Sequence, residues 1–255
     1  MNKIGLCSVT FRKLSVTEII DLAKQAEITG IEWGGDIHVP ANDIDNAKLV
    51  AKKTREAGLE VASYGSYYKV GESDNKFSFD EVLKTALALE TKNIRIWAGN
   101  IPSSQASLKQ RDAIIAETKE IAALAKQHDI TLSFEYHYNT LADSLTSARA
   151  LIEAINMDNV ALYWQSDVGI SFIEKMYNLR FMKHHVSNVH VFYWDESKRE
   201  KLADGYYDWL SYLKQLNLAL DKPRYYFIEF VKDDDPKQFL EDVKTLKQVL
   251  ADSEK

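Results

Sequence analysis

Short apolar runs alternate with amphipathic helical patterns along the whole chain, and this alternation limits the possible folds more than any other feature of the sequence. Several of the runs end roughly 25 to 40 residues apart, the length of one strand-plus-helix unit. Their last residues are Tyr64, Trp97, Glu135, Gln165, His190 and Glu229. Because no linker rich in Pro, Gly or Ser separates these units, they predict a parallel sheet within one domain.

The individual elements follow from apolar periodicity and from capping residues such as Ser15 and Gly58. The predicted strands are 3–9, 31–33, 60–64, 93–97, 131–134, 160–164, 188–192 and 225–230. The predicted helices are 16–27, 44–57, 79–89, 108–128, 144–155, 172–180, 207–216 and 236–250. The tyrosine-rich stretch 65–75 is expected to be a loop.

Such units can close into an eight-stranded barrel or form an open doubly wound sheet. An open sheet of the Rossmann type normally carries a G-x-G-x-x-G turn after its first strand, and residues 8–11 contain no glycine. A length of 255 residues is also typical of one α/β barrel. We therefore expect an α/β fold, a (β/α)8 TIM barrel, with residues 1–255 as a single domain.

Composition excludes several classes of function. The net charge is −6, and no long cluster of Lys and Arg is present, which argues against a nucleic-acid partner. No run approaches ~18 consecutive apolar residues, and the first residues lack the apolar core of a signal peptide, so we expect a cytoplasmic protein without a membrane partner. The single cysteine, Cys7, lies in an apolar run and is interpreted as a small buried residue rather than a nucleophile.

Four of the later strand ends form a candidate metal site. Parallel α/β folds bind ligands at the carboxyl ends of their strands, where Glu135, Gln165, His190 and Glu229 should meet. Two carboxylates, an imidazole and an amide oxygen suit Mn²⁺, with Mg²⁺, Co²⁺ or Zn²⁺ as alternatives. The alternative interpretation is that each glutamate forms an ion pair at the rim and that His190 is a buried, hydrogen-bonded histidine.

Six segments carry a resemblance to a known family. They read IEWGGDIHVP, IRIWAGN, FEYHYNTLAD, VALYWQSDVG, NVHVFYW and YYFIEFV. Together they resemble the xylose isomerase-like TIM barrels, which include sugar phosphate isomerases and epimerases, inosose dehydratases and DNA-repair enzymes of the endonuclease IV type. The family's metal ligands are Glu, Asp, His and Glu, and Glu135, His190 and Glu229 match three of them. Gln165 stands at the Asp position, which leaves Asp167 as an alternative ligand, and Val168 replaces a family histidine.

The resemblance implies a metal-dependent isomerase or epimerase of a small sugar or sugar phosphate. Glu135 and Glu229 would be the base and the acid that move a proton through an enediolate. Two alternatives remain. One is an inosose-type dehydratase of a cyclic polyol. The other is a non-catalytic sugar-binding barrel, which is favoured by the presence of Gln165 at the family's Asp position. A DNA-repair nuclease would need further metal ligands and a basic face. Barrels of this kind often form pairs, so a homodimer is an open alternative.

Other polar and aromatic residues near the strand ends are expected to contact a sugar or polyol substrate. The predicted substrate-binding residues are Glu32, His38, Tyr64, Arg95, Trp97 and His137. Arg95 has an alternative role as an ion-pair partner of Glu135, and the aromatic rings of Trp33, Tyr67 and Trp164, like those of Tyr64 and Trp97, could equally be barrel plugs. The basic pair Lys198 and Arg199 follows the seventh strand, where TIM barrels often bind phosphate, but its acidic neighbours favour a solvated loop.

Overall fold

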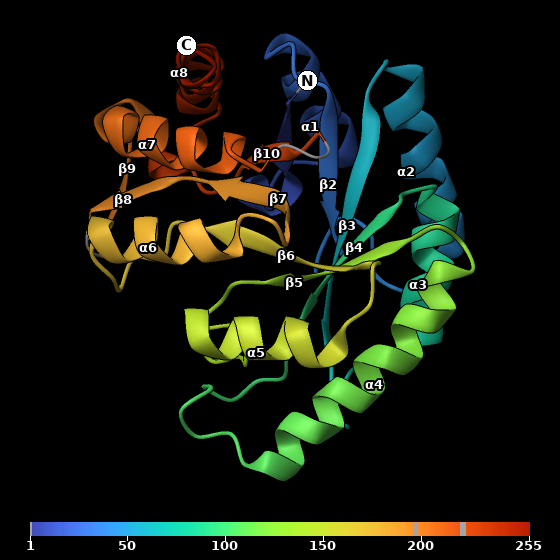
Figure 1. The fold of residues 1–255 in the computed structure, drawn as a ribbon. Helices are drawn as coiled ribbons and strands as arrows, with labels where there is room; N and C mark the ends of the chain where they lie inside the picture. The colour runs from blue at the N-terminus through green and yellow to red at the C-terminus, as the bar shows by residue number, and fades with distance from the viewer. Residues whose placement is uncertain (1, 196–197, 220–222) are drawn as a thin grey trace.

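The barrel prediction is confirmed. The computed structural model describes residues 2–195, 198–219 and 223–255. Its main sheet is a closed barrel of parallel strands in the order β1-β10-β7-β6-β5-β4-β3-β2, and helices cover its outside (Figure 1). The strands are β1 (Lys3–Cys7), β2 (Gly30–Gly34), β3 (Glu60–Lys69), β4 (Asn93–Trp97), β5 (Thr131–Glu135), β6 (Val160–Gln165), β7 (Val186–Val191) and β10 (Tyr225–Ile228). Among the described residues, no helix is both long and apolar enough to cross a membrane.

Each barrel strand is followed by a helix whose apolar stripe packs on the sheet. These helices are α1 (Val16–Gln25), α2 (Ile44–Glu56), α3 (Phe79–Leu89), α4 (Leu108–Lys126), α5 (Leu145–Ile155), α6 (Phe172–Met182), α7 (Tyr206–Asn217) and α8 (Pro236–Ser253). Four of them begin with a capping box, in which a serine and the residue three positions later bond to each other's backbone N–H groups. These capping serines are Ser15, Ser78, Ser107 and Ser171.

Three predicted strand ends differ by two or more residues, since β10 ends at Ile228 rather than Phe230, and the differences in β1 and β3 affect the mouth of the barrel. β1 ends at Cys7, because Ser8–Phe11 form a turn of 3-10 helix. β3 continues five residues beyond the expected Tyr64, to Lys69. Its pairing with β4 shifts register between Gly65 and Tyr68, and such a bulge redirects side chains. Beyond Gly65, Tyr67 lies beside Trp97 and Arg95 at the mouth, whereas Tyr68 packs against Phe79 of α3.

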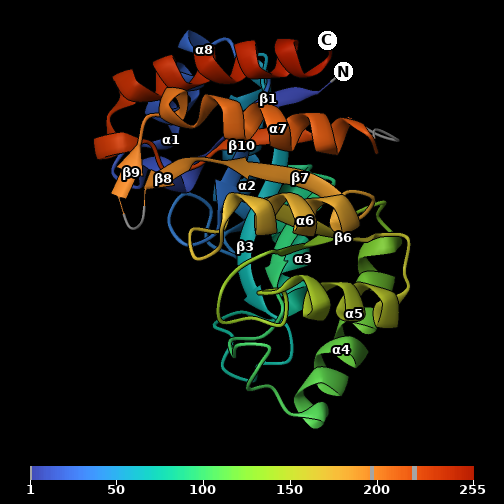
Figure 2. The same ribbon diagram turned by 60° about the vertical axis from the view of Figure 1, so that its left-hand side comes forward.

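A small hairpin replaces the solvated loop that was expected after the seventh strand. Strands β8 (Tyr193–Asp195) and β9 (Lys198–Glu200) pair antiparallel, and both ribbon views show them apart from the barrel sheet (Figures 1 and 2). Arg199 forms an ion pair with Asp234, and Lys232 forms one with Glu200. The hairpin is therefore tied to the short helix Lys232–Asp234 that follows the last barrel strand.

The inside of the barrel is filled, as expected for eight strands. Near the N-terminal ends of the strands, Asn93 bonds to Ser133 (2.8 Å), and the Ser133 hydroxyl lies 2.9 Å from that of Ser187. Higher in the barrel, the rings of Tyr163 and Phe227 stack with centroids 6.2 Å apart. This packing closes the barrel axis from below, so charged side chains above it can meet only at the mouth.

Candidate active site

One histidine lies at the centre of the residues that converge at the mouth. His190, on β7, is fully buried, and three side-chain oxygens surround its Nδ1 atom. These are Oε1 of Gln165 at 3.4 Å, Oε1 of Glu135 at 3.5 Å and Oε2 of Glu229 at 3.5 Å. The four residues predicted as metal ligands therefore come together, although they lie on four different strand ends. Asp167, the alternative ligand, instead accepts a hydrogen bond from the backbone N–H of Gly169 at 3.0 Å.

The other ring nitrogen of His190 faces a second carboxylate. Oε1 of Glu32 lies 3.3 Å from Nε2, and Glu32 is fully buried in the middle of β2. Metal-binding histidines commonly donate their second N–H to a carboxylate in this way, which turns the lone pair of the first nitrogen toward the metal. Glu32 was predicted to touch substrate. It is buried beneath His190, where its carboxylate is in a position to orient the imidazole.

These distances fit a divalent metal. Ligand bonds of about 2.1 Å in a tetrahedral arrangement place neighbouring ligand atoms about 3.4 Å apart. The three oxygens stand at this spacing from Nδ1, so Gln165, Glu135, Glu229 and His190 could hold the ion. Sγ of Cys7, one oxygen of Glu229 and one nitrogen of His190 also lie within 4.8 Å of one another.

A pair of donors holds Glu135 in place. Arg95 on β4 forms ion pairs with Glu32 (Nε to Oε1, 2.9 Å) and, through Nη1, with Glu135. Trp97 donates its indole N–H to Oε2 of Glu135 at 2.6 Å. Burial alone would favour the neutral acid, but the Arg95 charge outweighs it and lowers the pKa of Glu135 to about 2. Glu135 is thus ionised with one oxygen fixed and the other directed at His190.

Glu229 is in a different electrostatic environment. It follows β10 and is only 4% exposed. Burial raises its pKa, and the nearby Glu135 carboxylate adds to the effect, while the His190 imidazole opposes it. Burial lowers the pKa of His190, but the carboxylates of Glu229 and Glu32 outweigh it, and the pKa lies well above the usual value. The carboxylates leave an excess of negative charge around His190, and a bound cation would compensate this charge.

Two residues predicted to bind substrate lie away from the site. Tyr64 is fully buried, and its hydroxyl donates to the carbonyl of Val39. Side chains alternate along β3, so Tyr64 faces the helices while Gly65 faces the site. His38 is buried beyond the β2 strand end, with Nε2 3.0 Å from the carbonyl of Leu14 and its ring against Trp33. Both residues support the barrel wall.

Three aromatic rings do lie over the site. Trp97 and His137 are partly exposed and stack with centroids 4.8 Å apart. The ring of Tyr67 contacts Trp97 edge-on and lies 5.1 Å from the Arg95 guanidinium. Tyr67 takes a left-handed backbone (φ 58°), which costs a bulky residue energy and is more common at functional sites. Trp33 and Trp164, the other two candidates, face helices α2 and α7 and contribute packing.

Arg95 takes the role that was its alternative. It is 1% exposed and is bound on two sides by carboxylates, so it is an interior ion-pair partner of Glu135. Its Nη2 atom nevertheless has no hydrogen-bond partner among the described residues. An added Cβ on Gly65 would lie 2.7 Å from Nη2, so only glycine leaves this buried donor room beside β3.

Sequence reasoning missed Cys7 as part of the site. Its thiol lies 3.3 Å from Oε1 of Glu32 and 3.8 Å from Oε1 of Glu229. Burial, together with these two carboxylates, raises the pKa of the thiol, so Cys7 remains protonated. Its position at the end of the first strand was the available signal. The prediction that this strand continued to Val9 concealed that signal.

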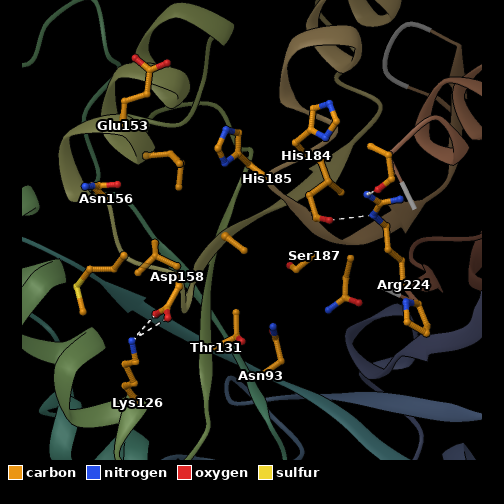
Figure 3. A pocket seen from close by; sticks show the side chains of 18 residues that line it. Asn93, Lys126, Thr131, Glu153, Asn156, Asp158, His184, His185, Ser187 and Arg224 are labelled. Carbon is orange, nitrogen blue, oxygen red and sulfur yellow. Dashed lines mark hydrogen bonds and ion pairs between the residues drawn. The ribbon is translucent and has the colours of Figure 1, made fainter. Parts of the chain in front are cut away.

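A large cavity lies at the other end of the barrel. It measures about 1020 Å³, and the first residues of β4, β5, β6 and β7 line it (Figure 3). Its polar residues are largely paired with protein groups, for example Lys126 with Asp158 at 2.6 Å. The N-terminal end of such barrels generally serves stability rather than chemistry. A smaller cavity of about 390 Å³ lies at the mouth, beside Phe230.

The fold and this cluster define a class of protein: a (β/α)8 barrel with a buried, carboxylate-rich histidine centre at the C-terminal ends of its strands. The sequence model of the xylose isomerase-like TIM barrel family matches residues 20–249, and the chain belongs to that family.

Known relatives of this chain include enzymes of more than one type. A 3-dehydroshikimate dehydratase from Bacillus anthracis is 24% identical over 203 residues, which cover 73% of this chain and 72% of that protein. The crystal structure of a probable 3-DHS dehydratase, AsbF, from the same organism has a TM-score of 0.79 at 17% identity, covering 96% and 98% of the two chains. The 3-keto-D-glucoside 4-epimerase YcjR from E. coli has a TM-score of 0.75 at 16% identity, with 98% and 100% coverage.

A further similar structure was solved with a bound metal. The crystal structure of the IOLI protein contains a bound zinc atom. It has a TM-score of 0.72 at 13% identity, and the match covers 98% of this chain and 97% of the IOLI chain. At these identities the solved structures establish the shared fold.

Proposed function

We propose that the protein is a metal-dependent isomerase or epimerase of a small sugar or a related polyhydroxylated carbonyl compound. The observation that carries this proposal is the convergence of Gln165, Glu135 and Glu229 on Nδ1 of His190, with Glu32 behind Nε2. Family membership supports it. Mn²⁺ is the proposed ion, with Zn²⁺, Co²⁺ and Mg²⁺ as alternatives that the same donors accept.

The two glutamates are placed to transfer a proton. They come from β5 and from the residue after β10, which β6 and β7 separate in the barrel, so they approach His190 from different sides. A divalent metal, when bound, supplies positive charge beside the substrate's carbonyl and hydroxyl oxygens. One carboxylate removes the proton from the carbon next to the carbonyl, and the C–H electron pair moves toward the carbonyl oxygen to give an enediolate.

The return of the proton determines the product. The second glutamate, in its acid form, gives a proton to the same carbon from the opposite face, which yields the epimer. Delivery to the neighbouring carbon yields the isomer. Arg95 and Trp97 hold Oε2 of Glu135, so this carboxylate needs little reorganisation before it reacts.

A dehydratase is the second candidate, and the 24% identical Bacillus anthracis protein favours it. The same first proton removal would then be followed by loss of the β-hydroxyl, with the second glutamate donating a proton to the departing oxygen. The two candidates share the acid and the base and differ in the substrate's leaving group.

Solvent deuterium exchange tests the proposal. The protein, supplied with Mn²⁺ in D₂O, is expected to introduce deuterium next to the carbonyl of a reactive ketose, measured by proton NMR. Glu135→Gln and Glu229→Gln should each reduce the exchange rate by about 10²- to 10⁴-fold. Glu153→Gln, at the opposite end of the barrel, is the matched control and should keep the wild-type rate. Exchange that survives both site substitutions would refute the assignment of acid and base.

A further inference from the structure

We propose that the cavity of about 390 Å³ at the mouth binds an anionic group of the substrate, a phosphate monoester or a carboxylate. The substrate would then be a charged sugar or polyol rather than a neutral one. This inference deepens the proposed function, since it concerns the end of the substrate that does not react.

Residues that line the cavity are linked to the proposed catalytic cluster along the chain and through side-chain contacts. Phe230 lines it and follows Glu229 in the chain. Val9 lines it and packs in the same small apolar cluster as Cys7, whose thiol contacts Glu229. Arg12 lines it and donates Nη2 to the hydroxyl of Tyr67 (3.3 Å), whose ring lies over Arg95. In this proposal the reacting carbons of the substrate lie near His190, and its anionic end extends into this space.

The lining is basic, although the chain as a whole is acidic. Three cationic residues, Arg12, Lys13 and Arg199, face one acidic residue, Asp234, in a protein of net charge −6. Arg12 is paired with Asp36 (3.0 Å) outside the lining. Lys13 is exposed and forms no ion pair among the described residues. Local positive charge of this kind attracts an anion.

Arg199 is held in a fixed orientation. Asp234 binds its Nη1, and the guanidinium lies 4.5 Å from the ring centre of Phe230 and 5.6 Å from that of Trp194. Among the described residues no acceptor other than Asp234 bonds to this guanidinium, so further N–H donors remain for a ligand. A guanidinium placed in this way recognises phosphate or carboxylate oxygens in a planar, two-point contact.

The position in the fold supports the same ligand chemistry. The cavity lies between the 3-10 turn after β1, the hairpin after β7 and the segment after β10. In TIM barrels the loops after the seventh and eighth strands frequently bind phosphate. The apolar side chains of Val9 and Phe230 provide a surface for the carbon chain that carries the anion.

Binding of simple anions tests the inference without requiring turnover. The probes are inorganic phosphate and acetate, titrated into the full-length protein and followed by the line width of their NMR signals. Arg199→Gln and Lys13→Gln should each weaken binding by about tenfold. Lys198→Gln removes the same charge from the neighbouring residue, which does not line the cavity, and should leave binding unchanged. Equal binding in the wild type and in both cavity variants would overturn the inference; Lys13 is exposed, so its replacement does not endanger folding.

Deuterium exchange then separates this inference from the proposed function. The probes are D-fructose, D-fructose 6-phosphate and D-fructuronate, which differ in the neutral, phosphate or carboxylate group at C6. We expect one anionic compound to have a KM at least about tenfold below that of fructose, with the difference lost in Arg199→Gln. The preferred anion identifies the natural group. Exchange that is equally efficient with fructose overturns the inference and leaves the function intact. Anion binding without any exchange leaves the anion site intact and contradicts the proposed function.

Discussion

Two buried arginines at opposite ends of the barrel show how differently the same side chain is used. At the N-terminal end, Arg224 donates to the backbone carbonyls of Val186, Leu216, Lys183 and Ala219, at 2.8 to 3.1 Å. At the mouth, Arg95 is bound to two carboxylates that also face His190, and its Nη2 has no partner among the described residues. The first arginine connects backbone segments, and the second arranges reactive side chains.

The largest expected effect is on stability, at the N-terminal end. Arg224→Met should lower the free energy of unfolding by about 3 to 5 kcal/mol, because several buried carbonyls lose their donor. Urea denaturation followed by circular dichroism measures the change. The rate of deuterium exchange per folded molecule should stay at the wild-type value. Lys126→Met, which removes an exposed ion pair in the same region, should cost less than about 1 kcal/mol.

The matching substitution at the mouth should act mainly on activity. Arg95→Met releases Oε2 of Glu135 and leaves two buried carboxylates without their cation, so we expect the exchange rate to fall about 10²-fold. Steady-state exchange at saturating substrate measures it. Should Arg95→Met lose only stability and keep its rate, the distinction between the two arginines would be wrong.

A smaller effect is expected from Gly65→Ala. The added Cβ would lie 2.7 Å from Nη2 of Arg95 and 3.1 Å from Oε1 of Glu32, so the ion pair must shift. We expect the exchange rate to fall about tenfold, because this pair positions Glu135 and His190. Gly169→Ala, where the nearest atom is 3.6 Å away at an exposed site, is the control and should be neutral.

The smallest effect concerns pH and the N-terminal cavity. Burial, with the nearby charge of His184, lowers the pKa of His185 below 6.5. The unfolded chain therefore binds this proton more readily than the folded protein, and stability is lost as the pH falls through 6.5 and regained above it. His185→Gln should flatten the fall in unfolding free energy between pH 7.5 and 5, measured by urea titration.

The ends of the strands show how much of the fold and of the site could be predicted from the sequence. Strand ends were visible as breaks in apolar runs, so Glu135, Gln165, His190 and Glu229 could be named together, and α3 and β4 have the predicted limits. Tyr64 was misplaced because β3 does not end there, and a strand that continues turns alternate residues to opposite faces. The predicted end of β1 at Val9 likewise concealed that Cys7 lies at a strand end.

The sequence by itself determined the alternation of strands and helices and the four strand-end residues Glu135, Gln165, His190 and Glu229. Apolar periodicity and strand length are local properties of the chain, and they were sufficient for both conclusions. Only the tertiary structure decided which atoms meet: that Glu32 lies behind His190, that Arg95 holds Glu135, and that Arg199 lies over Phe230. Such contacts depend on strand order, register and bulges, which arise when distant segments pack together and leave no signal within any one of them.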